Sequence, residues 1–357
     1  MSLLAKKRQL SSIGLDVDDH EFRAVQLVRE QGSLRAVAWA VFPRLHQDRD
    51  AEDGSFGVPG EEELAWASMI LSRRGFKGST VSVAPRTRDC TQHVFELPPP
   101  ESGAPLEQLA RAEIARARKC GVGDFEMGYW ALPQRGRTSE TMAVVCPARV
   151  IESMIDSYES VGLETVGIDL AEVAIIRGVS EQLSCNSSGG EPMIDTVLHL
   201  GWGSTLAIVT LGDRIVYVRR VGRGAGEVWD HALGRFGLSN KGARAVIGDF
   251  ETPEHDTQLE KIRLGCWNAL SKEIASELDV AVAYVSHSFR MVPLGRIVMS
   301  GFGAQNSQLR SQLDLTLGIP AVSAAPSALV DAIPASTPGD LPSRLAFAYG
   351  LAARFDV

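Results

Sequence analysis

The chain has 357 residues, of which 45% are hydrophobic and 22% are charged, and its formal net charge is −8. This length is large for one hydrophobic core and predicts two domains, and the composition excludes a mainly disordered chain. The acidic balance argues against general nucleic-acid binding, which needs a basic surface that displaces counterions from the phosphates.

The first half of the chain begins with strand-like segments and continues with mixed helices and strands. The first three runs are rich in branched and aromatic residues and are separated by turn residues, which is typical of a β-meander. The later segments show either helical spacing or short apolar runs. We predict strands at 13–17, 22–28, 34–42, 80–84, 129–132, 141–146 and 165–169, and helices at 61–74, 105–119, 149–161 and 171–183.

The second half repeats this order after a linker. The segment 184–192 (SCNSSGGEP) has the composition of a flexible connection. Three more strand-like runs follow it, so we expect a duplicated α/β architecture with domains at 1–190 and 191–357. The predicted elements are strands at 196–200, 205–211, 215–221 and 296–299, and helices near 226–236, 257–290, 305–317 and 345–354.

Cysteine usage and hydropathy indicate the compartment. The chain has five cysteines at wide spacings and no C-x-x-C segment, which predicts reduced thiols rather than a disulfide framework or a zinc site. The basic residues Lys6, Lys7 and Arg8 are followed by a stretch too polar for a signal peptide. No run is long enough to cross a bilayer. We therefore expect a cytosolic protein that reaches a membrane through a partner or a surface contact.

Three glycine-containing turns stand out in a chain without common nucleotide or metal motifs. No Walker A segment occurs, no G-x-G-x-x-G opens a helix after a strand, and no H-x-x-x-H spacing occurs. Gly14-Leu15-Asp16 ends the first strand, 201–205 (GWGST) joins two strands of the second half, and 300–304 (SGFGA) follows a late strand. A single glycine turn is usually only a turn. Their order across two similar halves is the informative feature.

This order resembles the actin/Hsp70/FtsA superfamily and, most closely, the PilM family of type IV pilus assembly proteins. The resemblance covers nearly the whole chain. It implies an α/β, actin-like fold of two lobes, with an inserted subdomain at about 85–162 in the first lobe and a C-terminal helix, 345–354, that returns to the first lobe. The segments that carry it are 13–17 (IGLDV), 96–99 (ELPP), 161–169 (VGLETVGID), 298–304 (VMSGFGA) and 345–351 (LAFAYGL).

In this superfamily the three turns surround ATP, so the resemblance implies where a nucleotide would lie. The corresponding positions here are Asp16, Gly201, Gly203, Ser204, Thr205, Gly301, Gly303 and Ala304. We expect these residues to form a vestigial ATP cleft without catalytic residues, metal or cofactor.

Five departures from the family pattern motivate that expectation. Asp18 and Asp19 place like charge where the phosphates would bind. His199 stands where the family has a carboxylate, and Trp202 and Phe302 add bulk where the backbone must approach the nucleotide. One alternative is a divalent cation held by Asp16, Asp18 and Asp19, although a solvated acidic turn is favoured.

The resemblance implies a scaffold or adaptor at the cytoplasmic face of an inner-membrane pilus or secretion platform. Its expected partners are the cytoplasmic N-terminal tail of a PilN-like membrane protein and other platform proteins, with self-association as a further option. The apolar face of the helix 105–119 and the prolines before it suggest that the inserted subdomain presents the groove for that tail. The alternatives are an active ATPase or kinase of the same fold, which would use ATP and Mg²⁺, and a polymerising FtsA-like protein.

Overall fold

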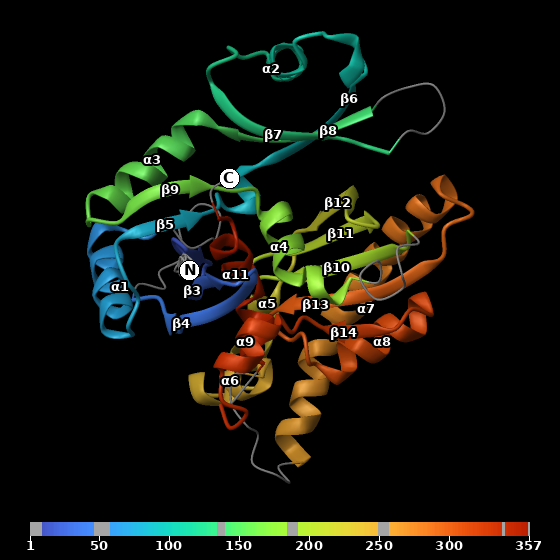
Figure 1. Ribbon diagram of the computed structural model, residues 1–357. Helices are drawn as coiled ribbons and strands as arrows, with labels where there is room; N and C mark the ends of the chain where they lie inside the picture. Colours follow the sequence, from blue (N-terminus) through green and yellow to red (C-terminus); the bar gives the residue numbers. More distant parts are fainter. Residues whose placement is uncertain are drawn as a thin grey trace, which may run out of the picture.

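The computed structural model describes residues 9–45, 58–133, 140–183, 192–248, 257–337 and 340–355. Within these ranges the strands form three separate sheets, shown in Figure 1. The predicted linker 184–192 lies almost entirely outside the described residues, and the predicted domain boundaries stay predictions.

The first sheet has the strand order β1-β3-β2-β5-β9, with β4 paired to β3. Strands β2, β3 and β4 form the predicted antiparallel meander, whereas β5 and β9 join it in parallel. We call this sheet, with the helices packed on it, the first lobe. Its strands are β1 (Gln9–Leu10), β2 (Ile13–Val17), β3 (Glu21–Glu30), β4 (Ser33–Pro43), β5 (Thr80–Val83) and β9 (Glu164–Ile168).

The second sheet repeats this design with the order β12-β11-β10-β13-β14. Its first three strands are again an antiparallel meander, and β13 and β14 again join in parallel. We call it, with its helices, the second lobe. Its strands are β10 (Ile194–Leu200), β11 (Thr205–Leu211), β12 (Arg214–Val221), β13 (Leu294–Gly301) and β14 (Ala321–Ser323).

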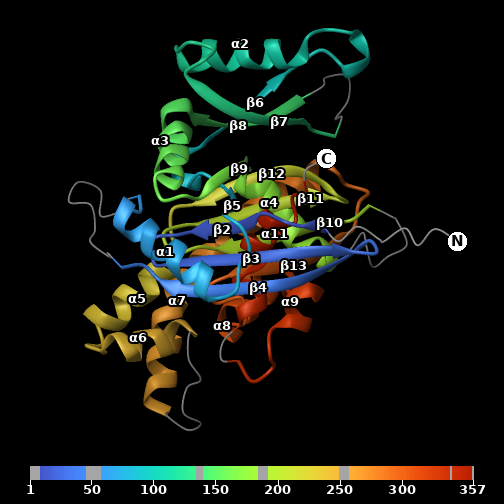
Figure 2. The ribbon, with the colours of Figure 1, turned by 60° about the vertical axis from the view of Figure 1, so that its left-hand side comes forward.

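The third sheet, with the order β6-β8-β7, stands away from the two lobes (Figure 2). It comprises β6 (Thr91–Glu96), β7 (Phe125–Ala131) and β8 (Glu140–Pro147), and we call it, with α2 (Leu106–Arg118), the inserted subdomain. Strand β6 was not predicted, because its side chains are mostly exposed or half-buried and carry little apolar signal.

The apolar face of the helix 105–119 packs against the sheet of its own subdomain. Ala110 and Ile114 of α2 are buried, and Ile114 packs with Phe125 and Val145 of the helix's own sheet. Figure 2 shows α2 on the face of that sheet turned away from the lobes. The amphipathic pattern therefore reports the core of the subdomain rather than a docking face.

Helices cover both lobes and connect them. The long helix α7 packs with α5, α6 and α8 around Trp267, whose indole Nε1 donates to the carbonyl of Val246 at 3.0 Å. The predicted helix 226–236 is followed by a second one, α6, which sequence analysis missed. The helices are α1 (Glu61–Arg73), α3 (Ala148–Glu159), α4 (Ala171–Val179), α5 (Ala225–Gly234), α6 (Asn240–Ile247), α7 (Thr257–Ser288), α8 (Ser307–Leu317), α9 (Ser327–Ala332), α10 (Leu341–Arg344) and α11 (Ala346–Ala352).

The C-terminal helix α11 packs against β2 and β3 of the first lobe and against α4. The packing is close enough to require glycine. A Cβ on Gly14 of β2 would lie 2.1 Å from the carbonyl oxygen of Ala348, and one on Gly350 would lie 1.8 Å from that of Ala174. These contacts fix β2 and α11 relative to each other, and the turn that follows β2 is positioned by them.

Candidate functional site

Two of the three turns meet between the lobes around a cavity of about 140 Å³, which we call the interlobe cleft. The turn after β2 contributes from the first lobe and the turn after β10 from the second. Of the predicted site residues, Asp16, Gly201, Gly203 and Ser204 line it, together with Asp18, Asp19, Trp202 and His199.

The remaining predicted residues do not line the cleft. The hydroxyl of Thr205 is used in a hydrogen bond to the carbonyl of Arg223, at 2.8 Å. Gly301 and Gly303 both have positive φ angles, 82° and 67°, and pack against Leu200 and Trp267. Ala304 is buried in the core of the second lobe. Thr205 ends the second turn and the other three residues shape the third, but none of the four borders the cleft.

The acidic turn is neutralised by a buried arginine. Arg23, which is 1% exposed, lies opposite Asp16 in the β2–β3 pairing, and its Nη1 is 3.1 Å from Asp16 Oδ2. The same guanidinium pairs with Asp18 and places its Nε 3.1 Å from Glu21 Oε1. Burial raises the pKa of Asp16, and the charge of Arg23 opposes this shift. The expectation of a solvated acidic turn is therefore wrong for Asp16 and Asp18.

Asp18 also occupies the backbone donors of its own turn. Its Oδ1 accepts hydrogen bonds from the backbone N–H groups of His20 and Glu21, at 2.7 and 2.9 Å. A turn that binds phosphate needs such N–H groups free to point at the anion. Here the side chain of Asp18 takes the place of an external anion, with Arg23 as its counter-cation.

An aromatic stack crosses the cleft. The imidazole of His20, from the first turn, stacks on the indole of Trp202, from the second, with ring centroids 3.9 Å apart and planes inclined by 4°. Burial, with the positive charges of Arg344 and Arg244, lowers the pKa of His20 to about 3, so the ring is neutral near pH 7. The bulk predicted for Trp202 therefore fills the cleft by pairing with the opposite lobe.

Phe302 joins the two lobes through two arginines. The guanidinium of Arg23 lies 5.1 Å and that of Arg344 lies 4.7 Å from the centre of its ring, distances at which a cation is attracted to the aromatic face. Arg344, in α10, also donates from Nε to Glu21 Oε1 at 2.7 Å. A segment near the C-terminus thus ties the acidic turn of the first lobe to the second lobe.

His199 is buried and neutral. Its Nδ1 lies 2.9 Å from the hydroxyl of Ser300, and its ring packs edge-on to Phe347. Burial, together with the charge of Arg23, lowers its pKa to about 3. Such a low pKa makes it a weak general base at neutral pH.

The mouth of the cleft is lined by the segment after β5. The guanidinium of Arg88 lies 3.3 Å from Asp19 Oδ1, and the hydroxyl of Thr87 lies 3.4 Å from that of Ser204 in the second turn. Gly203 faces Asp19, whose Oδ2 would lie 2.9 Å from a Cβ at that position. The carboxylates of this turn therefore all form ion pairs with arginines. Among the described residues, no group of three His, Cys, Asp or Glu side chains is arranged to hold a metal ion.

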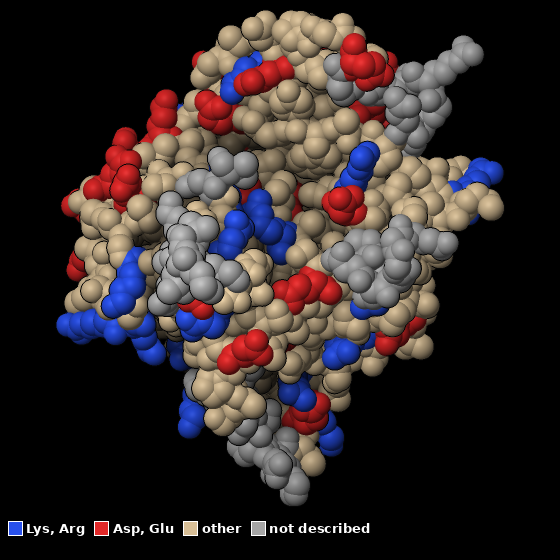
Figure 3. Space-filling model, in the orientation of Figure 1, with Lys and Arg blue, Asp and Glu red and all other residues tan. Residues whose placement is uncertain are grey.

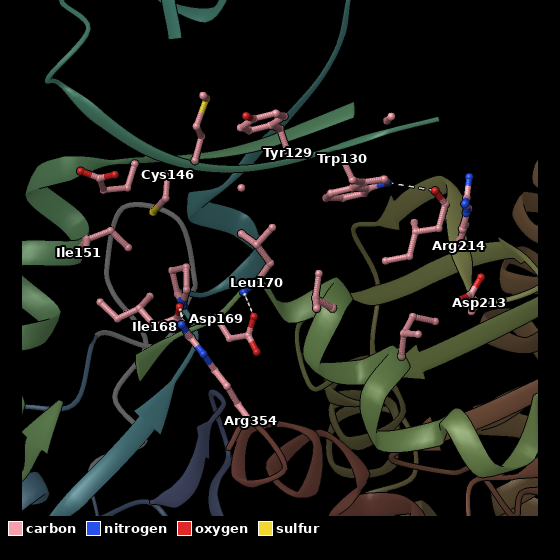
Figure 4. Close-up of a pocket in the computed structure, with 18 residues that line it drawn as sticks. Tyr129, Trp130, Cys146, Ile151, Ile168, Asp169, Leu170, Asp213, Arg214 and Arg354 are labelled. Atoms are coloured by element: carbon pink, nitrogen blue, oxygen red, sulfur yellow. Dashed lines mark hydrogen bonds between the residues drawn. The ribbon is translucent and has the colours of Figure 1, made fainter. Parts of the chain in front are cut away.

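A larger concavity of about 910 Å³, the subdomain groove, lies beneath the inserted subdomain. It is lined by β7, by β9 and α4, and by the turn between β11 and β12 (Figure 4). Trp130 of β7 donates from Nε1 to the carbonyl of Ile215 at 2.9 Å, which links the subdomain to the second lobe. Arg354 donates to the carbonyl of Ile168 at the opposite wall.

Figure 3 shows the surface hollowed beneath the subdomain, largely without charged side chains there and with a group of basic side chains below the hollow. The walls of this groove were not predicted from the sequence, because they come from segments far apart in the chain and each segment has the hydrophobic pattern of its own core. The sequence held one local indication of the groove. The predicted strand 165–169 is followed directly by a helix, so Asp169 and Leu170 lie at the end of a strand, and both line the groove.

Comparison with known proteins supports the fold. No protein-family model and no curated protein sequence matches the chain. Among solved structures, the chain is similar to one described as a PilM–PilN type IV pilus biogenesis complex, with a TM-score of 0.74, 17% identity and 98% of each chain covered. The ethanolamine utilization protein EutJ from Carboxydothermus hydrogenoformans matches with a TM-score of 0.49, 13% identity and coverage of 95% and 89%.

The chain therefore has the actin-like fold, and the predicted fold class and the resemblance to PilM in fold are confirmed. At this level of identity the likeness concerns the fold alone. In the part of the chain that the structure describes, no helix combines the length and apolarity that a membrane crossing needs.

Proposed function

We propose that this protein is a PilM-like cytoplasmic scaffold of an inner-membrane type IV pilus or related secretion platform, and that it does not hydrolyse ATP. The match to the PilM–PilN complex over 98% of both chains supports the scaffold role. The proposal that the protein does not hydrolyse ATP depends on one observation. In the interlobe cleft, Asp18 accepts hydrogen bonds from the backbone N–H groups that a phosphate would need.

Size and energy both oppose nucleotide binding in this cleft. Pockets for small-molecule ligands usually enclose about 300–1,000 Å³, whereas the interlobe cleft encloses about 140 Å³. To admit ATP, the protein would have to separate His20 from Trp202 and withdraw Asp18 from Arg23. Breaking one partner away from a buried ion pair costs about 3–5 kcal/mol. Binding would have to supply this energy before showing any net affinity.

Calorimetry with Mg-ATP on the purified protein tests this part of the proposal. We expect affinity weaker than about 1 mM, which corresponds to less than about 4 kcal/mol of binding free energy, and no release of phosphate. Micromolar binding would return the protein to the alternative, an active actin-like ATPase.

We assign the partner site to the subdomain groove. Its apolar lining can bury the side chains of a short peptide, and β7 lies at an edge of its sheet, with β8 as its partner among the described strands. An edge strand offers backbone N–H and C=O groups to an extended peptide, while neighbouring pockets select its side chains. We propose a PilN-like N-terminal tail as the peptide that this groove binds.

A matched pair of valine substitutions tests the groove. Val173 of α4 lines the groove, whereas Val166 of β9 does not line it and is 40% exposed. With the tail peptide of the PilN-like protein from the same organism as the probe, Val173→Lys should weaken binding at least tenfold, because it places a charge on an apolar wall. Val166→Lys should leave binding unchanged. Equal affinities for both variants, at equal thermal stability, would refute the assignment.

A further inference from the structure

Two cysteines face each other where the inserted subdomain joins the first lobe. Thr91 of β6 pairs with Val145 of β8 in an antiparallel register, which places Cys90 and Cys146 opposite each other one step further on. Cys90 has the extended backbone that continues the strand, with φ −101° and ψ 149°. The two thiols are near enough to affect each other's pKa, since Cys146 raises that of Cys90 and Cys90 lowers that of Cys146.

The geometry of such a pair suits a disulfide. Residues directly opposite in an antiparallel ladder have Cα atoms about 4.5–5.5 Å apart, and disulfides span Cα distances of about 4.4–6.8 Å. Both thiols are free in the structure. The disulfide can form without any change in the β6–β8 register. The reaction only has to remove one hydrogen atom from each thiol.

The position of the pair gives the bond a mechanical consequence. The chain enters the inserted subdomain directly after Cys90, at the start of β6, and leaves it directly after Cys146, at the end of β8. A covalent link there would close the base of the subdomain. Cys146 also lines the subdomain groove, and Figure 4 shows its side chain in the groove wall near Ile151. A small oxidant in the groove can therefore reach it.

The two thiols differ in their surroundings. Cys90 lowers the pKa of Cys146, while burial and the charge of Asp89 oppose that shift and Arg118 supports it. Cys146, burial and the charges of Glu172 and Asp89 raise the pKa of Cys90. Because Cys146 lines the groove, we assign it as the sulfur that meets the oxidant and Cys90 as the resolving one.

We propose that Cys90 and Cys146 are a redox-sensitive pair, in which a hydroperoxide converts the two thiols into a reversible disulfide that staples the base of the inserted subdomain. The Cys146 thiol reacts with the peroxide to give a sulfenic acid, with loss of water or an alcohol. The Cys90 thiol then attacks that sulfur, forming the S–S bond and releasing the sulfenic oxygen as water. A dithiol or reduced glutathione restores both thiols. This proposal does not rest on the proposed partner.

The test uses the full chain with Cys185→Ser, because Cys185 lies outside the described residues and could exchange with the pair. After treatment with hydrogen peroxide, differential alkylation and peptide mapping should show parallel loss of free thiol at Cys90 and Cys146, with recovery after reduction. Cys120 and Cys266 should stay free. Free thiols at both positions after treatment, or a link to Cys120 or Cys266, would overturn the proposal.

Two further measurements separate a staple from incidental oxidation. The oxidised protein should unfold at a higher temperature than the reduced one, because a cross-link constrains the unfolded chain. Cys90→Ser should abolish both the disulfide and this difference, and its Cys146 should accumulate oxygen adducts because no resolving thiol is present. Cys146→Ala provides a second variant if Cys90→Ser fails to fold. Equal unfolding temperatures for the oxidised and reduced forms would refute the stapling role.

Discussion

Removal of the buried guanidinium at position 23 is the most direct test of how the cleft is held. Arg23 is 1% exposed and faces the carboxylates of Asp16, Asp18 and Glu21. Arg23→Met keeps most of the side-chain length but leaves these carboxylates without their shared counter-charge. Loss of one partner from a buried ion pair costs about 3–5 kcal/mol, so we expect the free energy of unfolding to fall by about that amount at pH 7.5.

The loss should be smaller at acidic pH, and the sign follows from proton linkage. The pKa of Asp16 is already raised by burial, and without the opposing charge of Arg23 it should rise further. Above the unfolded pKa the folded variant then binds more protons than the unfolded chain, so its stability increases as pH falls. The difference between variant and parent should therefore shrink between pH 7.5 and pH 5.

Urea denaturation followed by tryptophan fluorescence measures both quantities, since Trp202 and Trp229 lie close to the cleft. Arg35→Met is the matched control, because Arg35 is 54% exposed and pairs only at the surface with Glu30, so its loss should cost less than about 1 kcal/mol. A cost below about 1 kcal/mol for Arg23→Met, or a cost independent of pH, would refute the view that the carboxylates depend on this arginine.

Three further outcomes are expected. A variant that removes the side chains blocking the cleft should bind Mg-ATP more tightly in calorimetry, if those side chains are the only obstacle. No gain in affinity would mean that the backbone of the cleft no longer has the shape that ATP needs. The variant combines Asp18→Gly, Asp19→Ser, Trp202→Ala and Phe302→Gly. Gly350→Ala should prevent soluble expression because its Cβ would meet the carbonyl of Ala174 at 1.8 Å, whereas Gly234→Ala, with open space around it, should express normally. Stability should fall as pH drops below about 6.5, because the pKa values of His20 and His199 are lowered to about 3 and the unfolded chain binds more protons; His20→Gln should flatten that slope in denaturation measurements.

The candidate site was predictable in part. The three turns could be recognised because glycines between strand-like runs are visible in the sequence, and the unusual residues within them could be identified from the family pattern. The pairing of Asp16 with Arg23 also had a local signal, since a hairpin with its turn after Val17 places these two residues opposite each other. Arg344 had no such signal, because more than three hundred residues separate it from Glu21.

The sequence alone determined the α/β class, the two antiparallel meanders and the turns with unusual residues, because alternation, helical spacing and turn chemistry are properties of neighbouring residues. Only the tertiary structure decided how those turns are occupied. In the folded protein Asp18 accepts hydrogen bonds from its own turn, whereas the sequence alone predicted a charge that repels phosphate. Phe302 lies against Arg23 and Arg344, and the apolar face of α2 packs on its own sheet. An isolated segment does not encode which distant charge or surface will meet its side chains, because that depends on how the lobes pack.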